Sequence, residues 1–271
     1  MRGLSRASRI GVLIALWLLV NTAAAVAQND DEYDKIYPFL GHWDSRISMP
    51  DGQDRGSCGG RTDEFGVKLV NCSMPVDQLP LNARGQAWLK YMDIFQSPST
   101  TECAGLSLPS ALGSAGDISF SGSSGRVIIN VSQFGDRTVW MNGIGPTPVN
   151  GELFHHKGYS VGRFEGNDLV FETSHFTFDP DGMDDHVHMA NSAQMRFTER
   201  YQLIDNDTLR VIMTIEDPIF LTRPFTYSRL FMKTPARGQA GGWNYCDPEA
   251  SRREVEFNYP DGGKYPNGKP R

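Results

Sequence analysis

The chain has 271 residues, a formal net charge of −6 and four cysteines, and 39% of its residues are hydrophobic. The acidic balance excludes nucleic acid and anionic membrane surfaces as preferred partners, because both attract a positive field. Since all-β barrels of this length commonly form one domain, we predict a single domain over residues 28–258.

The first 27 residues have the pattern of a secretory signal peptide. A basic start without acids precedes an apolar run over residues 10–20, and Ala25 and Ala27 provide a small-residue cleavage site. A membrane anchor is the alternative, but the run is shorter than the roughly 20 apolar residues of a spanning helix. We expect cleavage after Ala27 and a periplasmic or extracellular protein without an integral membrane segment.

The four cysteines of an exported chain predict two disulfides, because exported proteins fold in an oxidising compartment. They are Cys58, Cys72, Cys103 and Cys246. Cys58 and Cys72 flank a segment with hairpin character, so their pairing is favoured, and Cys103 would then pair with Cys246. A zinc site is the alternative, and it lacks the Cys-x-x-Cys spacing that is typical of such sites.

The rest of the chain indicates a β-protein. Residues 81–95 are the best candidate for a helix, with a strand as the alternative, and residues 97–125 are predicted to form a long surface loop around a weak strand because they are rich in Ser, Gly and Pro. Alternation of apolar and polar residues then predicts short strands joined by turns, a pattern typical of barrels and sandwiches. The predicted strands are 126–132, 137–142, 158–164, 168–176, 194–204, 208–217 and 225–233. Residues 259–271 are predicted to be a flexible tail.

Two sequence blocks resemble a large family of secreted bacterial lipocalin-like β-barrel proteins. Residues 158–173 read GYSVGRFEGNDLVFET, close to the family pattern GHSVGRWEGDTLVVET, and residues 193–209 read AQMRFTERYQLIDNDTL, close to its SEAMRVVERF pattern. Shorter matches are GHW at 41–43, PLNARGQA at 80–87, Cys103 and EDPIFLTRPF at 216–225. The resemblance implies an all-β, antiparallel lipocalin-like barrel with long loops and at most one or two short helices. Tyr159 replaces a histidine that is usual in the family, so no role of that histidine carries over.

Strict alternation predicts which polar side chains face the barrel interior. In QMRFTERYQL the apolar face includes Glu199 and Tyr201, and in DLVFETSH it includes Thr173 and His175. In GYSVGRF the predicted inward face carries Arg163, together with Tyr159 as a further ligand contact. These residues would place a carboxylate, an imidazole and a guanidinium inside a largely hydrophobic barrel.

Glu199 is the residue whose surroundings decide between these interpretations. A buried ionised carboxylate is costly unless it is paired. If Glu199 pairs with Arg163 or another donor, an internal ion pair fixes the strand register. If it is unpaired or shares a proton with His175, it becomes a candidate acid or base. Hydrogen bonding to a ligand is the third possibility.

The acidic segment 179–190 raises the question of a metal. His186 and His188 are two residues apart and could share a divalent ion if the backbone is extended. The aspartates of this segment could favour calcium, but the spacing of an EF-hand loop is missing. A solvated polar loop is the favoured interpretation, so no metal or other cofactor is predicted.

No nucleophile motif such as G-x-S-x-G and no phosphate-binding glycine loop occurs in the sequence. The leading hypothesis is an exported barrel that binds a small, mainly apolar molecule in its interior, with Arg163, His175, Glu199 and Tyr201 as polar contacts. One alternative is a cofactor-independent lyase, hydratase or isomerase in which Glu199 or His175 moves a proton. Another is a structural or interaction protein with a filled barrel.

Overall fold

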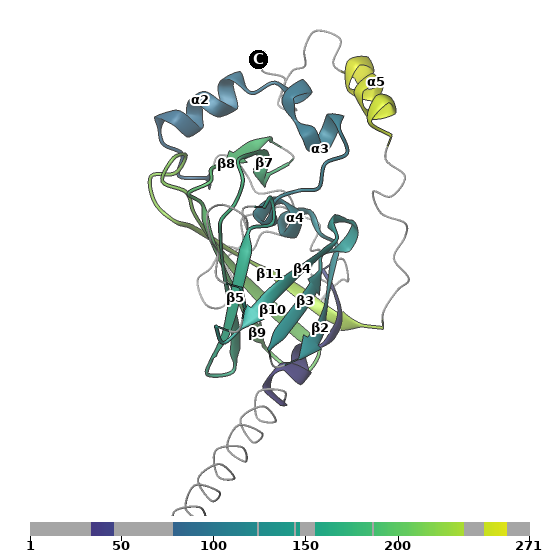
Figure 1. The fold of residues 1–271 in the computed structure, drawn as a ribbon, viewed down its shortest axis with the longest axis vertical. Coiled ribbons are helices and arrows are strands. Elements are labelled where there is room, and N and C mark those ends of the chain that lie inside the picture. Colours follow the sequence, from purple (N-terminus) through teal and green to yellow (C-terminus); the bar gives the residue numbers. More distant parts are fainter. Residues whose placement is uncertain are drawn as a thin grey trace, which may run out of the picture.

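The structure is a computed structural model that describes residues 34–45, 78–123, 125–143, 145–146, 155–185, 187–235 and 247–258. The predicted signal peptide, the tail 259–271, His186 and three of the four cysteines lie outside these ranges. Those predictions therefore stay predictions. The described part is a barrel that carries short helices and a small hairpin at one end (Figure 1).

The predicted β-barrel is confirmed. Nine strands of the described chain close in the order β1-β11-β10-β9-β6-β5-β4-β3-β2. They are β1 (Gly41–Asp44), β2 (Asp117–Ser123), β3 (Arg126–Asn130), β4 (Asp136–Met141), β5 (Tyr159–Glu165), β6 (Asp168–Ser174), β9 (Arg196–Leu203), β10 (Thr208–Glu216) and β11 (Phe225–Thr234). Their pairing is antiparallel as predicted except between β4 and β5, which are parallel. A parallel pair requires a connection that returns to the starting end of the sheet.

The helices are short. They are η1 (Tyr37–Phe39), α2 (Ala83–Tyr91), η3 (Ile94–Gln96), α3 (Pro98–Thr101), α4 (Leu108–Ser114), η4 (Ser132–Phe134) and α5 (Pro248–Asn258). The helix expected within 81–95 is confirmed as α2, which begins after Asn82, whose side chain accepts hydrogen bonds from the backbone of Arg84 and Gly85. No described helix combines the length and the apolar character that crossing a membrane would require.

The weak strand predicted within 97–125 is present as β2, but the prediction of a surface loop around it is wrong. This stretch forms α3, α4 and β2, and five of the seven residues of α4 are buried. Helix α4 lies at the end of the barrel (Figure 1), where Arg229 from β11 donates hydrogen bonds to the carbonyls of Leu112 and Gly113 near its C-terminus. A cation is favourable at that end of a helix dipole. The small side chains that are typical of loops also allow a helix to pack closely. The composition of this stretch therefore does not distinguish a surface loop from a packed helix.

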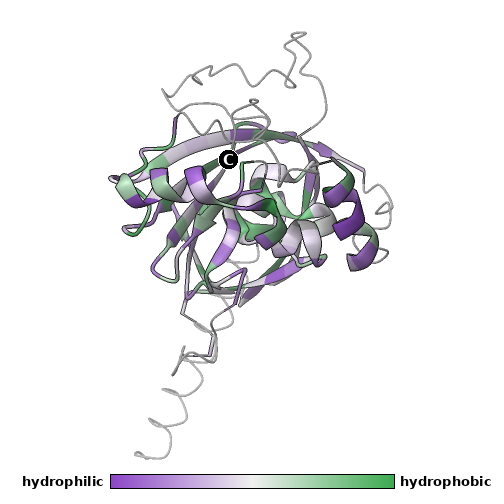
Figure 2. Ribbon diagram, turned by 90° about the horizontal axis from the view of Figure 1, so that it is seen from above, coloured by the Kyte–Doolittle hydropathy of each residue, from purple (hydrophilic) through white to green (hydrophobic). Residues whose placement is uncertain are grey.

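A two-stranded hairpin, β7 (Asp179–Asp184) and β8 (Met189–Asn191), packs beyond α4. The prediction of a solvated polar loop there is wrong, because seven of the nine residues of these two strands are buried. The buried aspartates are compensated by hydroxyl groups of the helical segments, such as those of Ser110 and Ser114, which donate to Asp185. Viewed from above, helix α5 at the right is mostly hydrophilic, whereas hydrophobic segments lie in the middle and at the left (Figure 2).

Side chains fill the barrel interior. Apart from Leu203 at the end of β9, the apolar residues that point inward from β3, β4, β6, β9 and β10 are at most 1% exposed. The ring of Tyr201 packs against Phe120 and Phe171, with centroids 5.2 and 5.1 Å apart. Barrels of modest strand number commonly have interiors packed in this way. Any ligand in this stretch of the barrel would have to displace core side chains.

Candidate functional site

A buried polar cluster lies inside the barrel around Glu199, which is 0% exposed. Its Oε1 accepts hydrogen bonds from Nη2 of Arg137 and, at 2.5 Å, from the hydroxyl of Tyr201. The predicted inward orientation of Glu199 and Tyr201 is therefore confirmed. Glu199 is paired, as the ion-pair alternative requires, but its partner is Arg137 of β4.

Arg137 connects this carboxylate to two hydroxyl groups on neighbouring strands. Its Nη1 donates to Ser160 at 3.2 Å and to Thr173 at 3.3 Å, and these two hydroxyl oxygens are 2.8 Å apart. Thr173 thus faces inward as predicted. Because the cluster joins four adjacent strands, β4, β5, β6 and β9, it acts as a cross-brace that holds their register.

The surroundings of Arg137 and Tyr201 shift the pKa of both groups. Burial is the largest single effect and lowers the pKa of Arg137, but the charges and hydrogen bonds of Glu199 and Tyr201 together outweigh it and hold that pKa above its ordinary value. Burial, followed by the charge of Glu199, raises the pKa of Tyr201 well above its ordinary value. Tyr201 therefore stays a hydroxyl donor. Oε2 of Glu199 and Nε of Arg137 are buried without a hydrogen-bond partner in the described chain.

The prediction that Arg163 faces the interior is wrong. Its side chain is 43% exposed and pairs with Glu165 and Glu172 on the outside of the barrel. The inward positions of β5 are Ser160 and Gly162. A Cβ at Gly162 would lie 2.6 Å from Sδ of Met141 and 2.8 Å from Cδ1 of Phe171, so β5 presents small residues where its neighbours are large.

Arg137 could have been found from the sequence. In the segment RTVWM, Arg137 lies two residues before Val139 and four before Met141, so all three share one face of β4. All three are buried. The same period-two argument that placed Glu199 inside places Arg137 inside. The polarity of the residue, which favours an exposed position, concealed this signal.

The prediction that His175 and Tyr159 face the interior is also wrong. Strand β6 ends at Ser174, and His175 has a φ of 59°, so the alternation stops before it. Its Nδ1 lies 2.8 Å from Oγ of Ser174, and its ring contacts the ring of Tyr159 edge to face at 6.2 Å. The hydroxyl of Tyr159 donates to the carbonyl of Pro146 at 2.7 Å.

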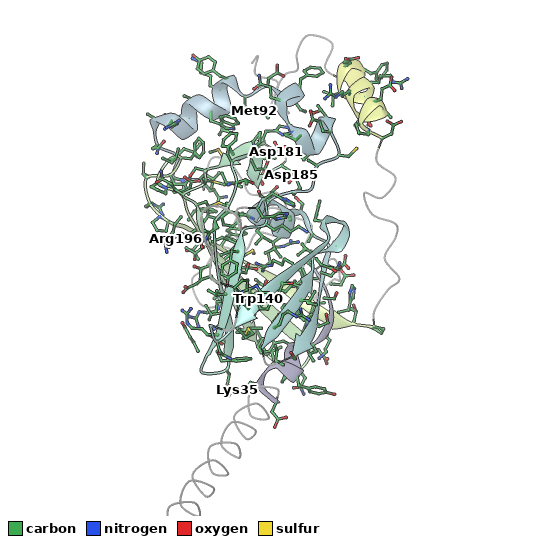
Figure 3. All side chains as sticks on the ribbon, in the orientation of Figure 1. Lys35, Met92, Trp140, Asp181, Asp185 and Arg196 are labelled. Carbon is green, nitrogen blue, oxygen red and sulfur yellow. The ribbon has the colours of Figure 1, made fainter. Side chains whose placement is uncertain are left out.

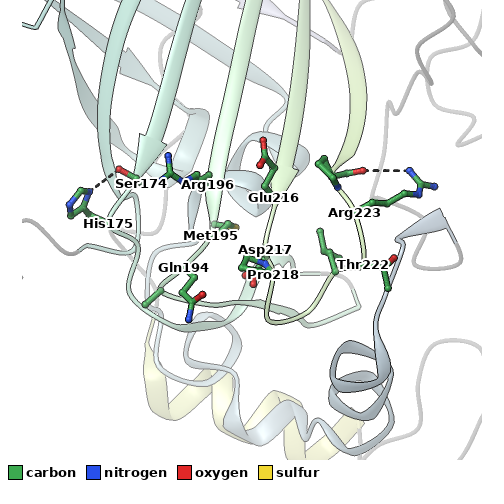
Figure 4. A pocket seen from close by; sticks show the side chains of 13 residues that line it. Ser174, His175, Gln194, Met195, Arg196, Glu216, Asp217, Pro218, Thr222 and Arg223 are labelled. Carbon is green, nitrogen blue, oxygen red and sulfur yellow. Dashed lines mark hydrogen bonds between the residues drawn. The ribbon is translucent and has the colours of Figure 1, made fainter.

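His175 instead lines a pocket of about 730 Å³ at the ends of β6, β9 and β10, which we call the strand-end pocket (Figure 4). Arg196 and Glu216 occupy paired positions on β9 and β10 and are both exposed, so the pocket lies on the outside of the barrel wall. The loop that follows β10 completes it with Thr222 and Arg223. Met195 and Leu221 provide buried apolar surface.

Positive charge is available in the strand-end pocket. The guanidinium of Arg196 has no hydrogen bond or ion pair with any residue of the described ranges, and Arg223 reaches only the carbonyl of Pro224, at 3.5 Å. The carboxylate of Asp217 is occupied, because it accepts from the backbone and hydroxyl of Ser192 at 2.6 and 2.9 Å and from the backbone of Ile219 at 3.0 Å. The carboxylate of Glu216 partly offsets the positive charge of Arg196 and Arg223.

Two histidines whose rings contact each other precede β5 near this pocket. The rings of His155 and His156 lie 3.9 Å apart between centroids, and the backbone N–H of His155 donates to the carbonyl of His175. Burial, with the like charges of His155 and Lys157, lowers the pKa of His156 to about 4. The folded state therefore keeps this ring neutral at pH values where the unfolded chain would protonate it.

This histidine predicts acid destabilisation. Between pH 6.5 and 4 the folded protein binds fewer protons at His156 than the unfolded chain does, so stability present above pH 6.5 is lost as pH falls through this window. His156→Gln should flatten the decrease in the free energy of unfolding over the same window. Urea titrations at pH 7, 5.5 and 4 measure the slope. An unchanged slope in the variant would contradict the assignment to His156.

Neither metal alternative gains support. The residues that the structure describes contain no group of three or more His, Cys, Asp or Glu side chains that could hold an ion. His186 lies outside them, and Nδ1 of His188 is hydrogen-bonded to Asp181. That the protein has no cofactor therefore stays a prediction.

The cysteine pairing also stays a prediction, with supporting geometry for one bridge. Sγ of Cys103 lies 3.9 Å from Oγ of Ser251 in α5, and no free cysteine occurs in the described ranges. Cys246 lies outside those ranges, two residues before Pro248, where α5 begins. A bridge from Cys103 to Cys246 would join α5 to α3, against which it packs.

Comparisons with protein-family models, with curated proteins and with solved structures find no match to this chain. The assignment of a function therefore depends on the residues and geometry described above.

Proposed function

We propose that this chain is an exported small-molecule-binding protein whose ligand occupies the strand-end pocket. The observation that carries the proposal is the position of two guanidinium groups, those of Arg196 and Arg223, at a pocket of about 730 Å³. Such a volume falls within the range of small-molecule sites. The signal-peptide pattern of residues 1–27 supports export.

The chemistry of the pocket favours an organic anion with an apolar body. Guanidinium groups bind carboxylates and sulfonates through charge-assisted hydrogen bonds. Met195, Pro218 and Leu221 supply apolar surface beside them. The ligand thus keeps the apolar character expected from the sequence but has an acidic group. The proposed site lies outside the barrel wall because side chains fill the interior.

The enzymatic alternative has weaker support from the geometry. Glu199 is enclosed on all sides and paired with Arg137, so a substrate has no access to its carboxylate in this conformation. His175 lies at the strand-end pocket and could contact a bound ligand there. Its proposed role is hydrogen bonding to the ligand.

Titration with 8-anilinonaphthalene-1-sulfonate, an apolar aromatic anion, tests the proposal. Its fluorescence should rise saturably with the purified mature protein. Arg196→Gln and Arg223→Gln should each raise the Kd about tenfold, because each removes a charge-assisted hydrogen bond worth about 1.5–3 kcal/mol. Arg126→Gln is the matched control, since Arg126 is an exposed arginine on β3 that does not line the pocket.

The neutral analogue N-phenyl-1-naphthylamine separates this site from a site in the barrel interior. It has a similar apolar body without the sulfonate, so it should bind the strand-end pocket more weakly than the anion. Stronger binding of the neutral probe, unaffected by the substitutions at Arg196 and Arg223, would overturn the proposal and favour the interior.

A further inference from the structure

An aspartate–histidine pair lies at the barrel end that carries the hairpin, and neither residue lines the strand-end pocket. Nδ1 of His188 is 2.8 Å from Oδ1 of Asp181, which is 0% exposed. Figure 3 places Asp181 in the hairpin below α3. Oδ2 of Asp181 accepts hydrogen bonds from Oγ of Ser99, at 2.5 Å, and from Oγ of Ser97.

These contacts fix the tautomer of the neutral imidazole. Oδ2 of Asp181 accepts from two hydroxyl groups, and its Oδ1 faces Nδ1 of the ring. An ionised carboxylate can only accept, so the proton of the neutral ring lies on Nδ1 and the lone pair on Nε2. Nε2 has no hydrogen-bond partner in the described chain, and the side chain of His188 is 10% exposed.

The ring is also fixed through the backbone. His188 has a φ of 56°, in the left-handed region, and its carbonyl accepts a hydrogen bond from Nε1 of Trp88 at 2.9 Å. A histidine held at its ring by a carboxylate and at its backbone by a helix presents Nε2 in one orientation. Pre-orientation of this kind is what a general base requires.

Aromatic surface adjoins the pair. Trp88 contacts Phe178 edge to face, with ring centroids 5.6 Å apart, and Phe178 is 53% exposed. This surface suits a substrate with a flat apolar group. A metal site is not supported at this end, because the described residues offer no group of three potential ligands.

We propose that His188 is a general base that activates water for hydrolysis of esters with an apolar group, and that Asp181 is its positioning residue. Nε2 takes a proton from water while the water oxygen bonds to the acyl carbon. The C–O bond of the ester then breaks, and the leaving alkoxide or phenolate takes up the proton. The products are a carboxylic acid and an alcohol or phenol. This inference does not depend on the strand-end pocket.

Hydrolysis of 4-nitrophenyl acetate by the purified mature protein tests the proposal. His188→Gly should lower kcat about 100-fold, the order expected when a general base is lost. Glycine tolerates the left-handed backbone at this position, so the variant should fold. Added imidazole should restore part of the rate to His188→Gly by replacing the missing ring.

Asn142→Gly is the matched control, because Asn142 has nearly the same backbone conformation, with a φ of 54°, and lies in neither proposed site. It should keep the rate of the unchanged protein. Asp181→Asn should lower kcat with KM unchanged, since it alters the orientation of the base and not the aromatic surface. Absence of hydrolysis above buffer, or an equal loss in both glycine variants, or no rescue by imidazole, would overturn the proposal.

Discussion

Replacing Arg137 with methionine should lower the free energy of unfolding by about 3–5 kcal/mol, because the enclosed carboxylate of Glu199 would lose its cation. The hydroxyl of Tyr201 would remain as a donor to Glu199. One neutral donor does not compensate a buried charge. Equilibrium unfolding in urea, followed by tryptophan fluorescence, measures the difference.

The double variant Arg137→Met, Glu199→Leu separates ion pairing from packing. Replacing a buried ion pair by apolar side chains of similar volume is often neutral or stabilising, so the double variant should recover most of the loss. Arg200→Gln is the control, since this arginine of β9 pairs with Glu165 and Asp168 on the outer face. It should change the free energy by at most about 1 kcal/mol. If Arg137→Met also lowered the free energy of unfolding by no more than about 1 kcal/mol, that result would contradict the role of the cluster as a cross-brace.

Gly182→Ala should destabilise the hairpin at the barrel end by about 3 kcal/mol or more. A Cβ at this position would overlap Oδ1 of Asn191 and lie 2.5 Å from its Cγ. Asn191 is 0% exposed, and its Nδ2 donates to the carbonyls of Thr177 and Ser192 at 2.9 and 3.0 Å. The methyl group would both overpack the site and break these hydrogen bonds, each effect costing about 1–3 kcal/mol.

Hydrogen exchange of the hairpin amides, together with urea unfolding, distinguishes local opening from loss of the whole fold. Gly113→Ala provides the control, because a Cβ at Gly113 in α4 meets nothing within 4 Å. Adding Asn191→Ala to Gly182→Ala removes the overlap and should restore part of the protection. If the hairpin amides of Gly182→Ala alone exchanged at the same rate as in the unchanged protein, the hairpin would accommodate the methyl group.

The barrel and its buried carboxylate could be predicted from the sequence because both depend on local periodicity. Strict alternation over 194–203 placed Glu199 and Tyr201 on the face that became the interior. A side chain two residues along a strand returns to the same face whatever the strand pairs with. The helix near residue 83 was predictable for a similar reason, since its cap at Asn82 is local.

Other placements required knowledge of which strands are neighbours. On β5 the polar Arg163 and the small Gly162 alternate, and either face could have been the inner one. The choice follows from Met141 on β4 and Phe171 on β6, which leave no room for a larger residue. His175 was misplaced because the strand ends one residue earlier, at a backbone conformation that alternation does not predict.

The sequence alone therefore determined the β-rich class and the inward position of Glu199, since both arise from the two-residue repeat of a strand. The tertiary structure decided that Arg137 is the partner of Glu199, and it brought Asp181 and His188 together with serines more than 80 residues away. The physical reason is that pairing across a closed barrel depends on strand order and on the volumes of side chains from several strands, which no local pattern contains.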